Sequence, residues 1–255
     1  MTDSRGVEPV KALLFDFDGT LLDGAGDREA IERTCREIAL LQDDLEADLL
    51  LAANSEAWRH YWPTVKRSWT LGGIDGAAVR HEAWRRTLSA CGYDDEALVR
   101  RATDMHSHHR LACIRAYPDA LATLSSLGGY SLALVTNGAS DTQRTSLRLL
   151  GIEDDFDAVV ISAEVGVAKP DPRIFEIALR ELGIGAENAC HIGDDPRTDI
   201  AGAHAAGLTA VWLNRSGNSS EDASDSDHEI PSLAALPGLL HSLGGQSPAP
   251  PTPTR

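Results

Sequence analysis

Apolar residues occur along the chain in two arrangements, short continuous runs and helical repeats. Five short runs are typical of buried parallel strands, and they cover 10–15, 131–135, 158–161, 189–192 and 210–213. Between the later runs, apolar positions recur at helical spacing and predict helices over 119–127, 143–150, 173–182 and 200–206. This alternation predicts an α/β fold, a Rossmann-like parallel sheet with helices on both faces.

The segment after the first run has a purely helical pattern and holds four of the chain's five tryptophans. Helical repeats begin near Ala30 and Leu45, and further helices are predicted over 77–90 and 94–106. We therefore predict an inserted α-helical cap, 24–111, between core segments 8–23 and 112–243. A loose acidic surface loop is expected over 218–229, a last helix over 233–243 and a disordered tail over 244–255.

The composition narrows the function classes. The 255 residues include 39 acidic and 23 basic side chains, which gives a net charge of −16. With no basic run, this balance argues against a nucleic acid polymer or an anionic membrane surface as partner. No apolar stretch is long enough to span a bilayer, the polar start is unlike a signal peptide, and the four cysteines are scattered. These features predict a cytoplasmic protein with reduced thiols.

Polar side chains follow several of the predicted strands at the point where each ends. Because carboxyl ends of parallel strands meet at one edge of a sheet, these side chains are expected to converge there. Carboxylates without Cys or His partners suit Mg²⁺, while an ammonium, a hydroxyl and backbone amides suit phosphate oxygens. The sequence thus predicts Mg²⁺-dependent chemistry on a phosphate at Asp16, Asp18, Thr136, Asn137, Lys169, Asp194 and Asp195.

Four motifs occur in order, and together they carry a family resemblance. They are Asp16-Phe-Asp18-Gly-Thr20, Thr136-Asn137-Gly138, Lys169-Pro170 and Gly193-Asp194-Asp195. The chain resembles the haloacid dehalogenase (HAD) superfamily, in the branch with a helical cap after the first strand. The resemblance spans Val10 to Arg215 and is weakest in the cap. It adds a specific set of roles to the general expectation above.

The resemblance implies that Asp16 is a nucleophile that forms an aspartyl-phosphate. Asp18 is implied to protonate the leaving oxygen and then to deprotonate the attacking water. Mg²⁺ is implied to bind a carboxylate oxygen of Asp16, the backbone carbonyl of Asp18, and Asp194. Lys169 is implied to neutralise Asp16 and the transferring group.

The resemblance also implies phosphate-binding residues and supporting acids. Thr136 and Asn137 are expected to hold phosphoryl oxygens together with backbone amides. Asp195 and Asp199 are expected either to reach the metal through water or to orient Lys169. These assignments favour a phosphatase, because dehalogenases of this superfamily lack an acid two residues after the nucleophile and need no Mg²⁺.

The substrate stays open at this stage. The resemblance is to phosphatases of sugar phosphates, acylneuraminate phosphates or nucleoside monophosphates, so the expected partner is a small phosphorylated metabolite and the chain a monomer or homodimer. A phosphomutase, and a catalytically idle binding or regulatory protein, remain alternatives. The three cap histidines near residue 108 are expected at the surface or a domain interface, and the cap tryptophans mostly in its core. Substrate contacts from the cap are sought among Trp58, His60, Tyr61, Lys66, Arg67 and Trp69.

Overall fold

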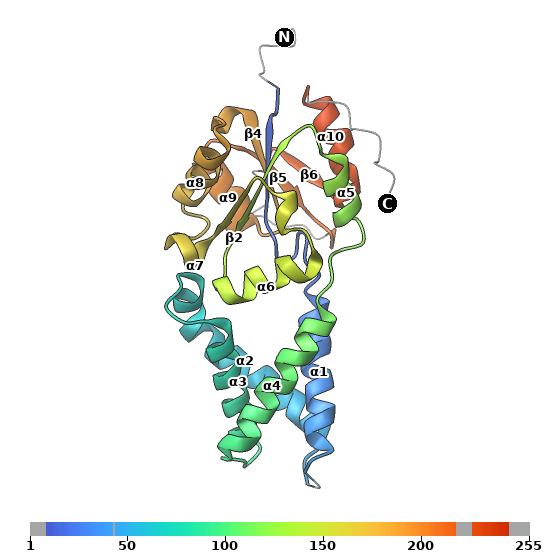
Figure 1. Cartoon of the computed structure of the whole chain (residues 1–255), viewed down its shortest axis with the longest axis vertical. Helices are drawn as coiled ribbons and strands as arrows, with labels where there is room; N and C mark the ends of the chain where they lie inside the picture. The colour runs from blue at the N-terminus through green and yellow to red at the C-terminus, as the bar shows by residue number, and fades with distance from the viewer. Residues whose placement is uncertain (1–8, 43, 218–225, 245–255) are drawn as a thin grey trace.

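The protein has two lobes in its computed structural model, which describes residues 9–42, 44–217 and 226–244. Figure 1 shows an α/β core at the top and a bundle of helices below it. Among the described residues, no helix has the length and apolarity that a membrane crossing requires. The predicted tail, apart from Gly244, lies outside the described residues.

The core is built on one six-stranded sheet whose strands are all parallel, as predicted, in the order β3-β2-β1-β4-β5-β6. β1 lies in the middle and pairs with β2 and β4, so its carboxyl end opens at the centre of the sheet edge. The strands are β1 Ala12–Phe15, β2 Ser131–Thr136, β3 Ala158–Ile161, β4 Ala189–Gly193, β5 Thr209–Leu213 and β6 His228–Ile230.

The sixth strand corrects the sequence prediction, which ended the sheet at residue 213 and placed 228 and 229 in a loose loop. β6 pairs with β5 through Val211 opposite His228, and Asn214 donates a backbone hydrogen bond to Ile230. Only Ile230 of its three residues is buried, so the strand has no apolar run that sequence could reveal. The middle of the predicted loop, 218–225, lies outside the described residues.

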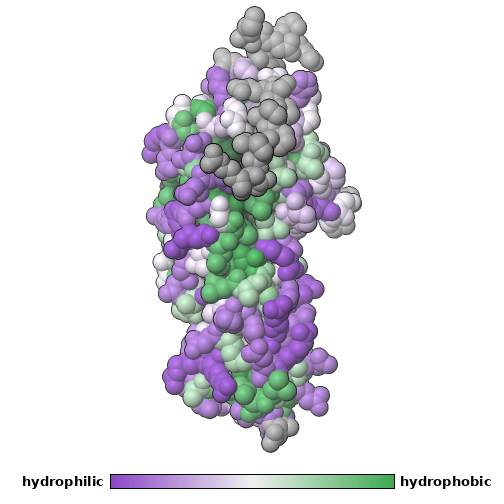
Figure 2. Space-filling view, turned by 45° about the vertical axis from the view of Figure 1, so that its right-hand side comes forward, coloured by the Kyte–Doolittle hydropathy of each residue, from purple (hydrophilic) through white to green (hydrophobic). Residues whose placement is uncertain are grey.

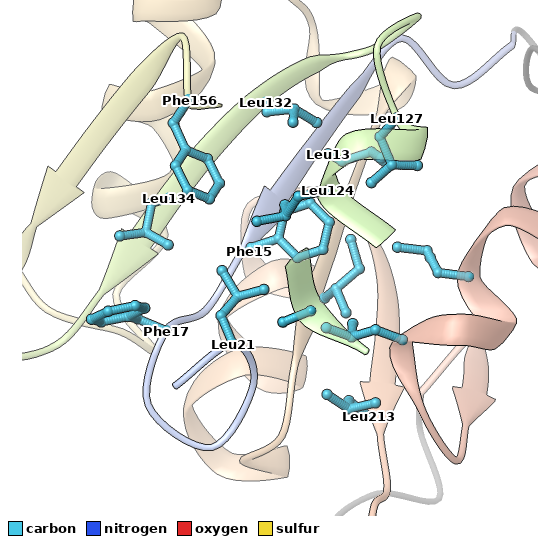
Figure 3. Close-up of a cluster of buried hydrophobic side chains, with 14 of the residues drawn as sticks. Leu13, Phe15, Phe17, Leu21, Leu124, Leu127, Leu132, Leu134, Phe156 and Leu213 are labelled. Atoms are coloured by element: carbon cyan, nitrogen blue, oxygen red, sulfur yellow. The ribbon is translucent and has the colours of Figure 1, made fainter. Parts of the chain in front are cut away.

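Helices cover both faces of the sheet, and the pleat of β1 explains why. Leu13 and Phe15 point into one apolar cluster, which is closed by α5 and α10, while Leu14 points into the other, beneath α8 and α9. In Figure 3 the Phe15 ring lies beside Leu124 of α5, and it meets Phe156 edge-on at 6.5 Å. Every residue of β1 is therefore buried, which fixes the strand that carries Asp16.

The remaining core elements connect these layers. The helices are α5 Ala120–Ser126, α6 Ser140–Leu150, α7 Ser162–Val165, α8 Pro172–Leu182, α9 Ala201–Ala205 and α10 Leu236–Ser242. The shorter helical turns are η1 Glu153–Asp155, η2 Ala186–Asn188, η3 Pro196–Ile200 and η5 Leu233–Ala235.

The cap is the helical insertion predicted after the first strand. Its helices are α1 Ala25–Ala39, α2 Ala47–Thr70, α3 Gly76–Ala90 and α4 Glu96–Cys113. Asp95 begins α4 by accepting a hydrogen bond from the amide of Ala97, in line with the predicted cap at 94 or 95. α2 continues through Pro63, well beyond the helical repeat seen in the sequence. The exact boundaries between the two domains stay a prediction.

The face drawn in Figure 2 is largely hydrophilic, and its hydrophobic residues gather mainly at the middle of the molecule and at the foot of the cap. At the foot, Leu40 is 86% exposed at the end of α1. The cap buries its own centre around Trp84, which is fully buried among apolar side chains of all four helices. The insertion is thus a packed unit with its own hydrophobic core.

Candidate active site

A cavity of about 780 Å³, partly open to solvent, lies between the core and the cap. Polar contacts hold the two lobes together beside it: Ser162 donates to the carbonyl of Thr70 at 2.6 Å, and Asp141 accepts from the amide of Gly76 at 2.9 Å. Gly138 permits a close approach, because a Cβ there would overlap Trp69 of α2. From the core, the cavity is lined by Asp16, Asp18, Asn137, Thr142, Lys169, Asp194, Asp195, Thr198 and Asp199.

Lys169 ties two acids together at the floor of the cavity. Its Nζ lies 2.5 Å from Asp16 Oδ1 and 2.7 Å from Asp199 Oδ1, and its side chain is only 2% exposed. Burial opposes the charge of Lys169, but the two carboxylates outweigh it and raise the pKa of the amine. Lys169 is therefore a fixed cation against Asp16.

His191 of β4 contacts Asp199 and helps to hold it in place. The sequence analysis did not predict this residue. His191 Nε2 lies 3.0 Å from Asp199 Oδ1, and the amide of Asp195 donates to Asp199 Oδ2 at 3.0 Å. Burial works against ionisation, but Lys169 and His191 hold the pKa of Asp199 well below its usual range. Both oxygens of Asp199 are thus engaged, one of them with Lys169, while its role in orienting Lys169 stays a prediction.

Asp194 completes a group of three acids suited to a metal ion. Asp16, Asp194 and Asp199 offer carboxylate oxygens that all lie within 4.8 Å of one another. Burial, with the charge of Asp199, raises the pKa of Asp194 to about 6. Gly19, at φ +86°, lies against this carboxylate, where any Cβ would overlap it.

This donor set fits Mg²⁺ on chemical grounds. Three carboxylates and one ammonium leave uncompensated negative charge, and oxygen donors without nitrogen or sulfur suit a hard divalent cation. Both oxygens of Asp199 accept hydrogen bonds, whereas only Oδ1 of Asp16 contacts Lys169, so Asp16 and Asp194 have the oxygens that are freer to bind a metal.

Asp18 has different partners from Asp16. Its side chain is open to the cavity, and Gln143 of α6 donates to its Oδ2 at 2.6 Å. The protein atoms around the cavity withhold water from the carboxyl and raise its pKa, against the opposing effect of Gln143. Gln143 also contacts the Thr136 hydroxyl at 3.0 Å. Sequence spacing gave no signal for Gln143, which a helix brings in from outside the four motifs.

The other predicted site residues lie close by but are partly engaged with the protein. Thr136 is fully buried behind the cavity wall. Asn137 exchanges two hydrogen bonds of 2.9 Å with the backbone of Lys169, so its side chain fixes the lysine loop. Asp195 accepts from the amide of Arg197 at 2.9 Å and begins η3. Phosphate binding by Thr136 and Asn137 stays a prediction.

From the cap, an aromatic wall faces these residues. Trp62 packs edge-on between Trp58 and Trp69, with ring centroids 6.0 and 5.1 Å away, and all three line the cavity. The expectation that the cap tryptophans lie mostly in its core is met fully by Trp84, while these three are half-buried, packing against a second cap cluster that includes Tyr61 and Val79 and also lining the cavity. Of the six residues proposed as substrate contacts, Trp58, Lys66 and Trp69 line the cavity, while His60, Tyr61 and Arg67 do not.

Cationic and imidazole side chains complete the cap side. Arg80 and Arg110, which the sequence analysis did not predict, line the cavity. His106 lines it too and is 4% exposed, so it lies where the cap meets the core, in line with the expected surface or domain-interface position. Its Nδ1 accepts from the Trp84 indole at 3.0 Å, so packing against the cap core buries the ring. His108 is exposed, and His109 pairs with Glu37 at 3.0 Å.

Known proteins share both the sequence and the fold. A phosphoserine phosphatase from Thermus thermophilus is 41% identical over 226 residues, which cover 81% of this chain and 89% of that protein. An (S)-2-haloacid dehalogenase from a Pseudomonas species is 28% identical over 93% of this chain and 99% of its own length. The magnesium-bound structure of the HAD hydrolase YfnB from Bacillus subtilis has a TM-score of 0.68 and 25% identity, and the match covers 91% and 99% of the two chains.

These relatives mix phosphatases with dehalogenases, so they establish the family and leave the substrate open. The haloacid dehalogenase-like hydrolase family matches residues 10–207, well over half of the chain, and the match contains all four motifs. Together with the six-stranded parallel sheet and the helical insertion after β1, this match shows that the chain is an enzyme of the haloacid dehalogenase-like hydrolase family.

Proposed function

We propose that this hydrolase is a Mg²⁺-dependent phosphatase of a small phosphorylated metabolite. One observation carries the proposal: the two acids at the end of β1 reach the same cavity with different partners. Asp16 is paired with Lys169, whereas Asp18 is held by the neutral amide of Gln143. A nucleophile and a proton donor need such a difference, because one must be ionised while the other is protonated.

In the first step, a carboxylate oxygen of Asp16 attacks phosphorus, and the bond between phosphorus and the leaving oxygen breaks. The leaving oxygen takes the proton of Asp18, so the alcohol departs neutral and Asp18 becomes a carboxylate. Lys169 balances charge on Asp16 and on the transferring oxygens, 2.5 Å from the nucleophile. Burial raises the pKa of both carboxyls in the metal-free protein, that of Asp16 despite the opposing charge of Lys169, so bound Mg²⁺ would be the further charge that favours the ionised nucleophile.

In the second step, water attacks the phosphorus of the Asp16 acyl phosphate and loses a proton to Asp18. Inorganic phosphate leaves, Asp16 is again a carboxylate, and Asp18 is again protonated. The cavity lies between cap and core, so closure of the cap on substrate binding would exclude bulk water from the first step. Mg²⁺ held by Asp16 and Asp194 would lower the repulsion between anionic substrate and anionic nucleophile.

Dehalogenation is the other activity found among the relatives. A halide leaves without a proton, so that reaction has no use for Asp18 or for the hydrogen bond that Gln143 donates to it. The second acid therefore favours the phosphatase reading over the dehalogenase reading.

The test is phosphate release from p-nitrophenyl phosphate and from a panel of phosphorylated metabolites, with and without Mg²⁺. The proposal expects turnover that requires Mg²⁺ and disappears in Asp16→Asn. Absence of turnover on every compound would support an idle binding protein, and chloride release from 2-chloropropionate would support a dehalogenase. Interconversion of a sugar 1-phosphate and 6-phosphate with little free phosphate would support a mutase.

A further inference from the structure

Two side chains at the carboxyl end of β5 contact the loops that carry the proposed metal ligands. Trp212 is the last residue but one of the strand, and its indole Nε1 donates to the backbone carbonyl of Asp194 at 3.0 Å. Arg215 follows shortly after the strand, and its Nη2 donates to the backbone carbonyl of Thr20 at 2.9 Å. Neither Trp212 nor Arg215 is among the residues that line the cavity, so we expect any effect on the site to pass through these loops.

Trp212 holds the backbone of Asp194. It lies opposite Gly193 in the parallel pair of β4 and β5, so its indole reaches one residue beyond the end of β4. The ring is 7% exposed and packs in the apolar cluster beneath α8 and α9, which limits its movement. Because a packed indole presents its N–H in one direction, it fixes the direction of the Asp194 carbonyl.

The side chain of Asp194 is confined as well, and the confining residue belongs to the loop that follows Asp16. An added Cβ at Gly19 would lie 2.3 Å from Asp194 Oδ2. The loops that carry the two proposed metal ligands therefore touch at Gly19 and Asp194, and a shift of either loop changes the separation of the two carboxylates.

Arg215 holds the loop after Asp16 at Thr20, the residue next to Gly19. On its other side the guanidinium binds Asp119 twice, with Nη1 2.9 Å from Oδ2 and Nη2 3.0 Å from Oδ1. It also stacks over the Tyr117 ring, 3.8 Å from the centroid. A guanidinium held by a bidentate carboxylate and an aromatic face has little freedom, so it presents a fixed donor to Thr20.

We infer that Trp212 and Arg215 are positioning residues for the metal site, which together set the separation of the Asp16 and Asp194 carboxylates. The inference rests on the proposed Mg²⁺-dependent function and adds two residues from a strand end that supplies no ligand. Mg²⁺ demands nearly ideal octahedral geometry, so ligands on two loops bind it well only where the loops are held together. Partners that orient a metal ligand commonly change metal affinity by about tenfold or more.

The test measures Mg²⁺ affinity without turnover, from the rise of Tm with Mg²⁺ concentration. Trp212→Phe keeps an aromatic ring and removes the donor, while Arg215→Lys keeps the charge and removes the forked geometry. Each variant is expected to weaken Mg²⁺ binding by about threefold to tenfold, the effect of one hydrogen bond. The Mg²⁺ concentration that gives half-maximal turnover of p-nitrophenyl phosphate should rise by the same factor.

Two matched controls separate misplaced ligands from a general loss of stability. Trp84→Phe removes another buried indole donor, whose partner is His106 in the cap. Arg144→Lys removes another guanidinium that binds carboxylates, those of Glu153 and Glu164, both at 2.7 Å. Both controls are expected to lower the metal-free Tm and to keep the wild-type affinity for Mg²⁺.

Wild-type Mg²⁺ affinity in both Trp212→Phe and Arg215→Lys, whatever their metal-free Tm, would overturn the inference while the phosphatase function stands. Absence of any Mg²⁺ effect on the Tm and the turnover of the wild-type enzyme would instead refute the proposed function.

A measurement on the wild-type sequence covers the case in which the variants do not fold. The enzyme is labelled with fluorotryptophan, and the fluorine resonance of Trp212 is identified by elimination, with phenylalanine variants of the other four tryptophans. This resonance is expected to shift as Mg²⁺ binds, with the midpoint that the thermal melts give. A resonance that stays unchanged at saturating Mg²⁺ would contradict the link between Trp212 and the metal site.

Discussion

Gln143 donates a 2.6 Å hydrogen bond to Asp18 from α6, an element outside all four sequence motifs. The same amide nitrogen contacts the Thr136 hydroxyl at 3.0 Å, so one side chain links Asp18, the proposed general acid, to the strand beside β1. Because Asp18 is otherwise open to the cavity, this bond decides where its carboxyl points. The orientation of the proposed proton donor therefore depends on a residue that only the fold brings to the site.

Gln143→Met should test this role, since it keeps the length of the side chain and removes the donor. We expect kcat for alkyl phosphates to fall by roughly tenfold to a hundredfold, because a misplaced acid protonates the leaving oxygen poorly. Aryl phosphates should lose much less, since a phenolate leaves without full protonation. Steady-state rates on both substrate types give the comparison, with Asp18→Asn as the reference for complete loss of the acid. An equal loss on both types would show that Gln143 does not act through Asp18.

The buried chain from His191 through Asp199 to Lys169 gives a second prediction. His191→Phe keeps the edge-on packing against Phe175, whose ring lies 4.8 Å away, but removes the partner of Asp199. We expect a loss of about 1–3 kcal/mol in unfolding free energy. We also expect a lower kcat, as Lys169 becomes less firmly fixed beside Asp16. Chemical denaturation and steady-state kinetics measure the two effects, and wild-type values for both would remove His191 from the network.

Asp194→Asn should raise the Tm of the metal-free protein and abolish the increase in Tm that Mg²⁺ causes. The raised pKa of Asp194, caused by burial and by Asp199, marks a carboxylate that is destabilised in the metal-free protein. The variant is therefore expected to raise the metal-free Tm, by about 2–4 °C for each 1 kcal/mol of repulsion removed. Mg²⁺ should raise the Tm of wild type but not of Asp194→Asn. Thermal melts in EDTA and in Mg²⁺ check both statements, and an equal Mg²⁺ response in both proteins would contradict the assigned ligand.

Two glycine-to-alanine substitutions test whether the backbone at Gly19 requires glycine, with an unconstrained glycine as the control. Gly19→Ala is expected to cost at least about 1–2 kcal/mol, since its φ of +86° is strained for alanine. It should also impair activity, because its Cβ would overlap the Asp194 carboxylate. Gly24→Ala is the control, as no atom lies within 4 Å of a Cβ there and φ is −65°. Denaturation and activity assays should separate the two, and comparable behaviour would refute the close approach of Gly19 to Asp194.

Much of the fold could be predicted from the sequence because its signals are local. Each of the first five strands is a short apolar run, and the burial of every residue of β1 shows why the run is continuous. β6 was not predicted, because a single buried isoleucine gives the strand no repeating pattern of apolar residues. The rest of α2 was not predicted, because a segment rich in tryptophan and interrupted by Pro63 is not typical of a helix. In the structure this segment nevertheless continues α2.

The site residues likewise fall into those that the sequence predicts and those that it does not. Asp16, Asp18, Lys169 and Asp194 stand at strand ends or in the loop after β3, so spacing and topology place them together. Gln143, His191, Arg80 and Arg110 could not be found by these means, since helix orientation, a buried strand position and closure of the cap bring them in. The expected surface or domain-interface position of His106 was right, but its hydrogen bond to Trp84 could not be predicted, because it joins residues far apart in sequence.

The most direct test of the central claim is to identify the phosphorylated residue during turnover. The enzyme is mixed with p-nitrophenyl phosphate and Mg²⁺, quenched in acid, digested and examined by mass spectrometry. The proposed mechanism predicts a phosphoryl group on the peptide that contains Asp16, and more of it in Asp18→Asn, where hydrolysis of the intermediate is slowed. Phosphate release that persists in Asp16→Asn, or a phosphoryl group found on another residue during turnover, would contradict it.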